Sequence, residues 1–320
     1  MSASTENTPA TGLPAPVLSY SPVVLSPPGR PVDLQLRVTA PVNGTGLPTI
    51  LLSHGHGPSH NLSSLNGYGP LANLWAALGF VVIQPTHLSS RTLAGELADL
   101  PGAPFFWRSR AGDMTYVLDR LEAIEKTVPL LAGRIDHGSV AVAGHSLGGF
   151  TASQLLGARI TDPDTGQEAN LIEPRIRTGV LLAAPGRGGE VLTGLMAEKT
   201  PFLRTMDFST MTAPTLVVAG DNDDSRHFTD MGPAWHTDPY TLAPGPMTLL
   251  TLFGAEHGLG GIAGYDAAET TDENPRLVAA LAHLTAAYLR TRLRPGDTAW
   301  QAACDALATS PDPVGRVESK

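Results

Sequence analysis

A serine lies where the sequence changes abruptly in character, within the run GHSLG at residues 144–148. The four residues before this run, VAVA, have the apolar pattern of a buried strand, and those after it have the small, apolar character of a packed helix. A sharp strand-to-helix turn strains its corner residue and needs small neighbours, which glycine supplies. We therefore expect Ser146 to project above the edge of a sheet, with the backbone N–H of Leu147 pointing into the same space. Together they offer a nucleophilic hydroxyl and a donor to an oxyanion, as acyl transfer requires.

Two further loops carry a carboxylate and a histidine directly after predicted strands. The run TLVVA at 215–219 is followed by GDND, and the run TLLTLF at 248–253 is followed by GAEHG. With the G-x-S-x-G corner, these loops resemble the α/β-hydrolase family in chain order, over roughly residues 17–294. The resemblance implies that Ser146 is the nucleophile, that Asp223 at the G-x-x-D position is the acid and that His257 is the base. In such a site the histidine takes the serine proton, while the carboxylate fixes the histidine tautomer and stabilises the imidazolium.

Other carboxylates lie near the same strand ends and must be weighed against Asp223. Asp221 directly follows its strand, so we expect it to shape the turn, and Asp224 should project elsewhere. Glu256 adjoins His257, and neighbours in an extended loop point apart, which makes Glu256 a poor partner for that histidine. Asp223 remains the predicted acid.

The second donor to an oxyanion is expected in the loop SHGHG at 53–57. Its His-Gly-His run matches the H-G-x pattern of the family, which implies that the backbone N–H of His56 acts together with that of Leu147. A rival interpretation takes His54, His56 and His60 as metal ligands, because histidines two apart on a loop can share an ion. The loop lacks the aspartate of the H-x-H-x-D-H spacing, so we predict no metal and no cofactor.

Two apolar segments are candidates for a substrate pocket. The aromatic run FFW at 105–107 either packs against the following helix or forms a wall near the serine, and the segment 186–211 either packs or forms a small lid or cleft wall. Apolar loops without a basic cluster favour a neutral, apolar acyl group, because each buried methylene contributes about 0.8 kcal/mol. The pocket residues that we expect are His54, Phe106, Trp107 and Phe202.

A charged pattern at the start of a predicted helix extends the resemblance. Arg108-x-Arg110-x-x-Asp113, followed by VLD at 117–119, resembles the branch that contains chlorophyllases, platelet-activating-factor acetylhydrolases and dienelactone-hydrolase-like esterases. On the residues alone, Asp113 has a second interpretation, as an acidic group favoured by the helix dipole.

The elements that must position these loops alternate between strands and helices. Helical stripes run through 71–78, 114–124 and 277–288, the last opened by Asn274 as cap and Pro275 in the first turn. Such alternation predicts an α/β fold with a mostly parallel sheet, helices on both faces and an antiparallel N-terminal hairpin. Ligands in such sheets bind at the carboxyl ends of the strands, where the candidate loops lie. The predicted strands are 17–26, 32–40, 49–53, 80–84, 139–143, 179–183, 215–219 and 248–253.

Composition narrows the function classes. The chain has 320 residues and a formal net charge of −9, without the basic stripe that a nucleic acid would need. We expect one domain over 15–309 with disordered tails at 1–14 and 310–320. No stretch is long enough to span a membrane, the N-terminus lacks the pattern of a secretory signal, and Cys304 is the only cysteine, so a cytoplasmic location is expected.

These observations predict a serine esterase that cleaves a small-molecule carboxylic ester through an acyl-enzyme. Amidase and thioesterase activities would use the same residues and stay open as alternatives. A ligand-binding protein on a hydrolase scaffold is a third alternative, disfavoured because the chain carries every member of the serine, histidine and aspartate set.

Overall fold

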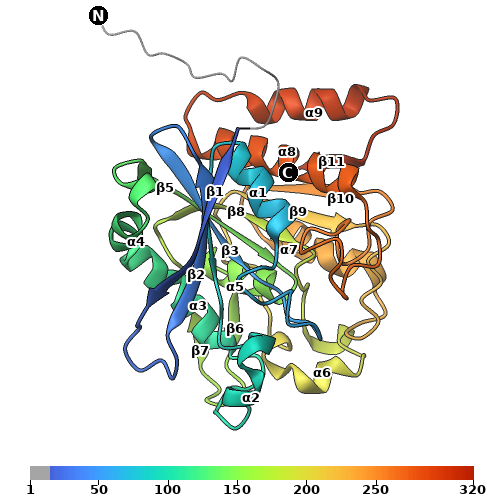
Figure 1. Ribbon diagram of the computed structural model, residues 1–320. Helices are drawn as coiled ribbons and strands as arrows, with labels where there is room; N and C mark the ends of the chain where they lie inside the picture. The colour runs from blue at the N-terminus through green and yellow to red at the C-terminus, as the bar shows by residue number, and fades with distance from the viewer. Residues whose placement is uncertain (1–14) are drawn as a thin grey trace, which may run out of the picture.

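The central feature of the computed structural model is a large sheet whose strands are mostly parallel (Figure 1). The structure describes residues 15–320, so the predicted N-terminal tail at 1–14 lies outside the described residues. Strands β3, β4, β5, β8, β9 and β10 of this sheet run parallel to one another, whereas β1, β2 and β11 pair antiparallel with their neighbours. The spatial order is β1 (Val17–Leu25), β2 (Leu34–Pro41), β4 (Val81–Pro85), β3 (Leu47–Ser53), β5 (Ile135–His145), β8 (Ile176–Leu182), β9 (Thr215–Gly220), β10 (Met247–Leu252) and β11 (Gly315–Ser319). The predicted α/β architecture with an N-terminal antiparallel hairpin is confirmed.

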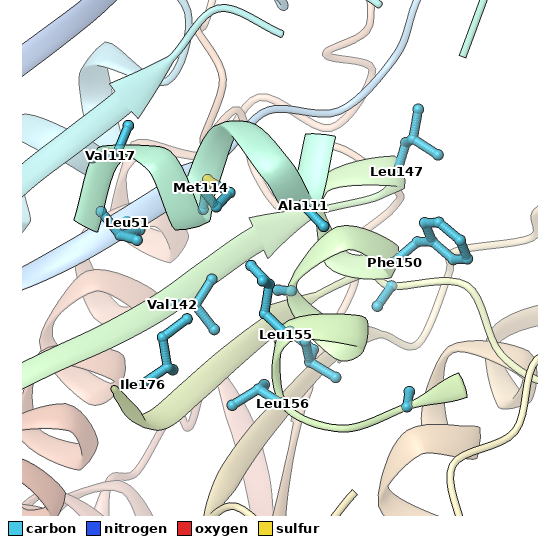
Figure 2. Packing of buried hydrophobic residues seen from close by; sticks show 14 of the residues in the cluster. Leu51, Ala111, Met114, Val117, Val142, Leu147, Phe150, Leu155, Leu156 and Ile176 are labelled. Carbon is cyan, nitrogen blue, oxygen red and sulfur yellow. The ribbon is translucent and has the colours of Figure 1, made fainter. Parts of the chain in front are cut away.

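Helices cover both faces of this sheet because its inner strands are apolar on both sides. Leu51 and Val142 face one helical layer, whereas their neighbours Ile50 and Ala141 face the other. The first layer includes α3 (Trp107–Asp119) and α5 (Leu147–Leu155), and the second includes α1 (Gly69–Ala77) and α8 (Pro275–Leu293). Figure 2 shows the first layer, with Met114 of α3 and Phe150 of α5 beside the strand that carries Val142. The remaining α-helices are α2 (Ala94–Leu97), α4 (Leu121–Thr127), α6 (Met196–Lys199), α7 (Asp238–Leu242) and α9 (Ala299–Thr309).

The start of α8 illustrates how local sequence sets an element boundary. The side chain of Asn274 accepts a hydrogen bond from the backbone N–H of Leu277 at 3.1 Å, and Pro275 occupies the first turn. The predicted cap and first-turn proline are confirmed. The stripe predicted at 114–124 is instead divided between α3 and α4, because Arg120 leaves helical geometry with φ −112° and ψ 9°.

The prediction that residues 310–320 are disordered is wrong. Residues 315–319 form β11, which pairs antiparallel with β10, so that Val317 lies opposite Leu250. The strand has a polar sequence because it forms the exposed edge of the sheet, and this pairing extends the ordered fold beyond residue 309. The small hairpin of β6 (Arg159–Thr161) and β7 (Glu168–Asn170) was also not predicted.

Membrane insertion through a helix has no support in the part of the chain that the structure describes. None of the helices in residues 15–320 combines the length and the apolar character that crossing a bilayer requires.

Candidate active site

Ser146 occupies a strained corner between β5 and α5. Its φ of 53° and ψ of −120° are unusual for a residue that carries a side chain. Glycines make this corner sterically feasible: a β-carbon on Gly144 would collide with the carbonyl oxygen of Gly148, and one on Gly149 would lie 2.6 Å from the β-carbon of Ala184. The predicted crowding around the G-x-S-x-G run is therefore confirmed.

The structure brings Ser146, His257 and Asp223 together at the carboxyl ends of three strands. The Oγ of Ser146 lies 2.9 Å from Nε2 of His257, and Nδ1 of the same imidazole lies 2.8 Å from Oδ2 of Asp223. The His257 side chain is 43% exposed while that of Asp223 is only 1% exposed, so the imidazole stands between solvent and a buried carboxylate. These contacts connect a hydroxyl, an imidazole and a carboxylate in the order that proton transfer from the serine would require.

The neighbouring carboxylates have other partners. Asp221 accepts a hydrogen bond from the backbone N–H of Gly254 at 2.6 Å, so its side chain links the loop after β9 to the loop after β10. Asp224 is exposed and pairs with Arg226, and Glu256 bonds to Thr271. Among these acids, the structure places only Asp223 against His257.

A second histidine shares the Asp223 carboxylate, and the sequence did not indicate it. Nε2 of His236 lies 3.1 Å from Oδ2 of Asp223, and both side chains are 1% exposed. Burial alone raises the pKa of Asp223, but hydrogen bonds from His236 and His257 outweigh burial and hold that pKa well below its ordinary value. Asp223 is therefore ionised at neutral pH.

A chain of hydrogen bonds joins the serine corner to the loops on either side. The backbone N–H of Gly55 donates to the Tyr68 hydroxyl at 2.9 Å, and that hydroxyl lies 2.7 Å from Nδ1 of His145. Nε2 of His145 in turn lies 2.8 Å from the carbonyl oxygen of His257. Burial, followed by the nearby His257, lowers the pKa of His145 to about 3, so its imidazole is neutral. His145 therefore fixes the positions of three segments relative to one another: the loop after β3, the serine corner and the loop that carries His257.

The two backbone N–H groups predicted to bind an oxyanion, those of Leu147 and His56, follow the ends of the neighbouring strands β5 and β3. Leu147 is the first residue of α5, where N–H groups lack partners within the helix. His56 lies in the loop after β3, and Ser53 at the end of that strand is in register with Gly144. Within residues 15–320, neither N–H group donates a hydrogen bond to another part of the protein. The N–H of Gly55 differs, because the Tyr68 hydroxyl already accepts from it.

A buried arginine fixes the loop after β3 to α5. The guanidinium of Arg110 is fully buried and donates to the hydroxyls of Ser53 and Thr151 at 3.1 Å and 2.9 Å, and also to the carbonyl oxygen of His54. Burial lowers the pKa of Arg110 to about 9, which leaves the group charged at neutral pH. This charged side chain therefore links the end of β3 and the first residue of the following loop to the middle of α5.

Asp113 belongs to the same buried network. It accepts a hydrogen bond from Arg30 and contacts Nδ1 of His87, both at 2.9 Å. Burial raises the pKa of Asp113 to about 6, against the opposing charge of Arg30. Asp113 lies well inside α3 rather than in its first turn, so the interpretation through the helix dipole is wrong.

The structure places three of the four predicted pocket residues in the packed interior. His54 is buried, with Nε2 accepting from the backbone N–H of His87 at 3.1 Å, and it does not line the cavity that includes His56. Trp107 and Phe202 stack on each other within the core, with ring centroids 6.3 Å apart. Of the four predicted pocket residues, Phe106 is the one that lines a cavity of about 230 Å³, and His56 also lines this cavity.

The segment 186–211 is mainly a packed wall. Its residues Phe202, Leu203, Phe208 and Met211 are all buried in the core. Leu195 is the exception, with 86% exposure. Phe202 packs against Trp107 of α3 and Phe150 of α5, so this part of the segment belongs to the core.

The histidines of the loop after β3 are not gathered as a metal site. Nδ1 of His56 lies 3.3 Å from the carbonyl oxygen of Ser89, and Nε2 of His54 accepts a hydrogen bond from the backbone N–H of His87. In residues 15–320, one group of metal-binding side-chain types lies within reach of a shared ion, namely Asp223, His236 and His257. Its contacts at 2.8 Å and 3.1 Å have the lengths of hydrogen bonds between these side chains.

A scan against protein-family models finds no match for the chain, and a search of curated proteins finds no similar sequence. The fold and the site define the chain as an α/β protein with a hydrogen-bonded serine, histidine and aspartate at the carboxyl edge of its sheet.

Proposed function

We propose that this chain is a serine hydrolase with an α/β-hydrolase fold, and that it cleaves a carboxylic ester. The observation that carries the proposal is the alignment of Ser146, His257 and Asp223, with a strained serine 2.9 Å from a histidine that contacts a buried carboxylate. The chain order of these residues and their positions after three parallel strands give further support.

Each residue has a defined part in the reaction. The Oγ of Ser146 attacks the ester carbonyl carbon while its proton passes to Nε2 of His257, and the N–H groups of His56 and Leu147 bind the oxyanion. As the tetrahedral intermediate collapses, the C–O bond to the alcohol breaks and His257 gives the proton to the leaving oxygen. Water then attacks the acyl-enzyme with His257 again as base, and the acid and free Ser146 are released.

The cavity beside His56 supports an apolar group on one side of the ester bond. Its apolar wall includes Leu88, Leu97, Pro104 and Phe106, while Ser89, Ser90 and Arg91 give it a polar side, and its volume of about 230 Å³ suits a short to medium chain. Each methylene that leaves water there contributes about 0.8 kcal/mol, so neutral esters with short to medium apolar groups are the proposed substrates.

A panel of p-nitrophenyl esters of increasing acyl length tests this function. We expect turnover by the wild-type protein, a preference for short to medium chains and a loss of about 10⁴- to 10⁶-fold in kcat in Ser146→Ala. Ser153→Ala is the matched control, because this buried serine of α5 bonds to the Gly149 carbonyl and does not contact His257.

Unchanged turnover in Ser146→Ala would refute the proposal, and binding of esters without turnover would indicate a ligand-binding protein. Amide and thioester analogues of the best ester extend the panel, because the same residues would act on them. Faster cleavage of either analogue would replace esterase by amidase or thioesterase activity.

A further inference from the structure

Asp223 is unusual in this site because two imidazoles share one of its oxygens. Nδ1 of His257 lies 2.8 Å from Oδ2, and Nε2 of His236 lies 3.1 Å from the same atom. The His257 ring is partly exposed, whereas His236 is buried, and the two ring centroids lie 5.6 Å apart. The mechanism above uses His257 and leaves His236 without a role.

The hydrogen-bond partners of His236 determine where its protons lie. Nδ1 of His236 lies 2.8 Å from the carbonyl oxygen of Ala184, which can only accept, so Nδ1 carries a proton. Nε2 faces the Asp223 carboxylate and also the Ser225 hydroxyl, at 2.8 Å. That hydroxyl donates its single proton to Oδ1 of Asp223 at 3.1 Å, so it presents a lone pair to His236. Acceptors therefore face both ring nitrogens, which is the environment of an imidazolium.

Other ionisable groups surround His236, and their charges are consistent with this state. Asp238, at the start of α7, is buried and lies close enough to act on His236, and it also pairs with Arg187 at 3.6 Å. Burial raises the pKa of Asp238, against the N–H and the charge of Arg187. His145, at the end of β5, is neutral because burial lowers its pKa to about 3. The remaining neighbours are Asp223, after β9, and His257, after β10.

We propose that His236 is a positioning residue that carries a positive charge and holds Asp223 ionised and oriented, and that its charge keeps His257 neutral in mildly acidic solution. The inference rests on the proposed function, in which neutral His257 is the base. Asp223 carries a single negative charge, which the His236 imidazolium already balances. Protonation of His257 would place a second positive charge beside the first, and like-charge repulsion disfavours this. The protein should therefore remain active at a lower pH than it would with an unshared aspartate.

Substitution of His236 by glutamine tests this charge directly, because glutamine retains an N–H donor for Asp223 but is neutral. In His236→Gln we expect the acidic limb of the kcat/KM profile to move to higher pH by about one to two units. The same upward shift should appear in the NMR titration of the His257 ring. A purely structural role would lower the plateau of kcat/KM and leave both midpoints in place.

Two matched variants separate charge from packing. Ser225→Ala removes a hydroxyl from the cluster but leaves the charge of His236, so the His257 midpoint should stay within a few tenths of a pH unit. His137→Gln removes a histidine that pairs with Glu125 at 2.8 Å near the opposite end of β5, so neither activity nor the midpoint should change.

The ring ¹⁵N shifts of His236 in the wild-type protein give a readout that needs no variant. Shifts of a doubly protonated ring at pH 7 are expected, whereas those of a neutral tautomer would overturn the inference, even if His236→Gln fails to fold. An unmoved His257 midpoint in folded His236→Gln would overturn it as well. Because both NMR measurements work without turnover, a lack of ester hydrolysis would count against the proposed function alone.

Discussion

His145 donates its Nε2–H to the backbone carbonyl of His257 across 2.8 Å, and this bond fixes the histidine loop relative to the serine corner. Because burial keeps the His145 ring neutral, its Nδ1 is an acceptor and receives the Tyr68 hydroxyl proton. Tyr68 in turn accepts from the N–H of Gly55. One neutral tautomer thus connects three loops that the reaction needs in a fixed arrangement.

Tyr68→Phe should weaken this connection. The substitution leaves the Gly55 N–H and Nδ1 of His145 buried without partners, which costs about 1–3 kcal/mol of unfolding free energy. Because the loop that carries His56 loosens, kcat should fall more than KM rises. Urea unfolding and ester kinetics measure the two effects.

Tyr20→Phe is the control for that variant, since Tyr20 is 44% exposed on β1. It should change the unfolding free energy by no more than about 0.5 kcal/mol. Equal effects of the two substitutions on stability and kcat would contradict the proposed role of Tyr68.

The buried histidines predict how stability depends on pH. Burial lowers the pKa of His54, His87 and His145 in the folded state, so between those pKa values and the unfolded value of 6.5 the unfolded chain binds more protons. The unfolding free energy should therefore fall as pH decreases below about 6.5. The contribution of His145 extends to its folded pKa of about 3.

His145→Asn isolates one of these contributions. It should remove about 1.4 kcal/mol per pH unit from the slope of unfolding free energy against pH between about pH 6 and pH 4. His283→Asn, at an exposed position of α8, should leave the slope unchanged. Urea titrations at several pH values measure both slopes, and an unaltered slope in His145→Asn would show that His145 is charged in the folded state.

Gly149 at the crowded corner and Gly112 on an open face of α3 should respond in opposite ways to substitution by alanine. Gly149→Ala places a β-carbon 2.6 Å from that of Ala184, so the unfolding free energy should fall by about 1–3 kcal/mol. A β-carbon on Gly112, in α3, meets no atom within 4 Å, so Gly112→Ala should stabilise by roughly 0.5–1 kcal/mol. Thermal unfolding distinguishes them, and equal melting temperatures would argue against a crowded corner.

The identity of the acid follows from comparing two adjacent aspartates. Asp223→Asn should retain the fold yet lower kcat by up to about 10⁴-fold, because the orienting carboxylate is lost. Asp224→Asn should stay within about tenfold of the wild-type kcat, because Asp224 is exposed and pairs with Arg226. A larger loss in Asp224→Asn, measured at equal thermal stability, would transfer the role to Asp224.

The inner strands could be predicted because burial on both faces leaves apolar runs in the sequence. β9 and β10 are examples, with every residue buried. β11 could not be found this way, since GRVES is polar and its order depends on pairing with a distant strand. Edge strands depend on tertiary contacts that a local pattern does not record.

The candidate site likewise has residues whose positions could be predicted from the sequence and residues whose positions could not. Ser146, Asp223 and His257 follow strands at recognisable spacings, so their meeting could be predicted from chain order. The contact between His236 and Asp223 depends on how a polar loop folds back, and its sequence carries no periodic signal. The burial of His54, predicted to line a pocket, likewise follows from contacts made after folding.

The most direct test of the account is site-resolved labelling with a fluorophosphonate, which reacts with a serine that a neighbouring base activates. Intact mass and peptide mapping should show one adduct, on Ser146, with no adduct in Ser146→Ala and slower labelling in Asp223→Asn. An adduct on another serine, or labelling that persists in Ser146→Ala, would contradict the assignment of Ser146 as the nucleophile.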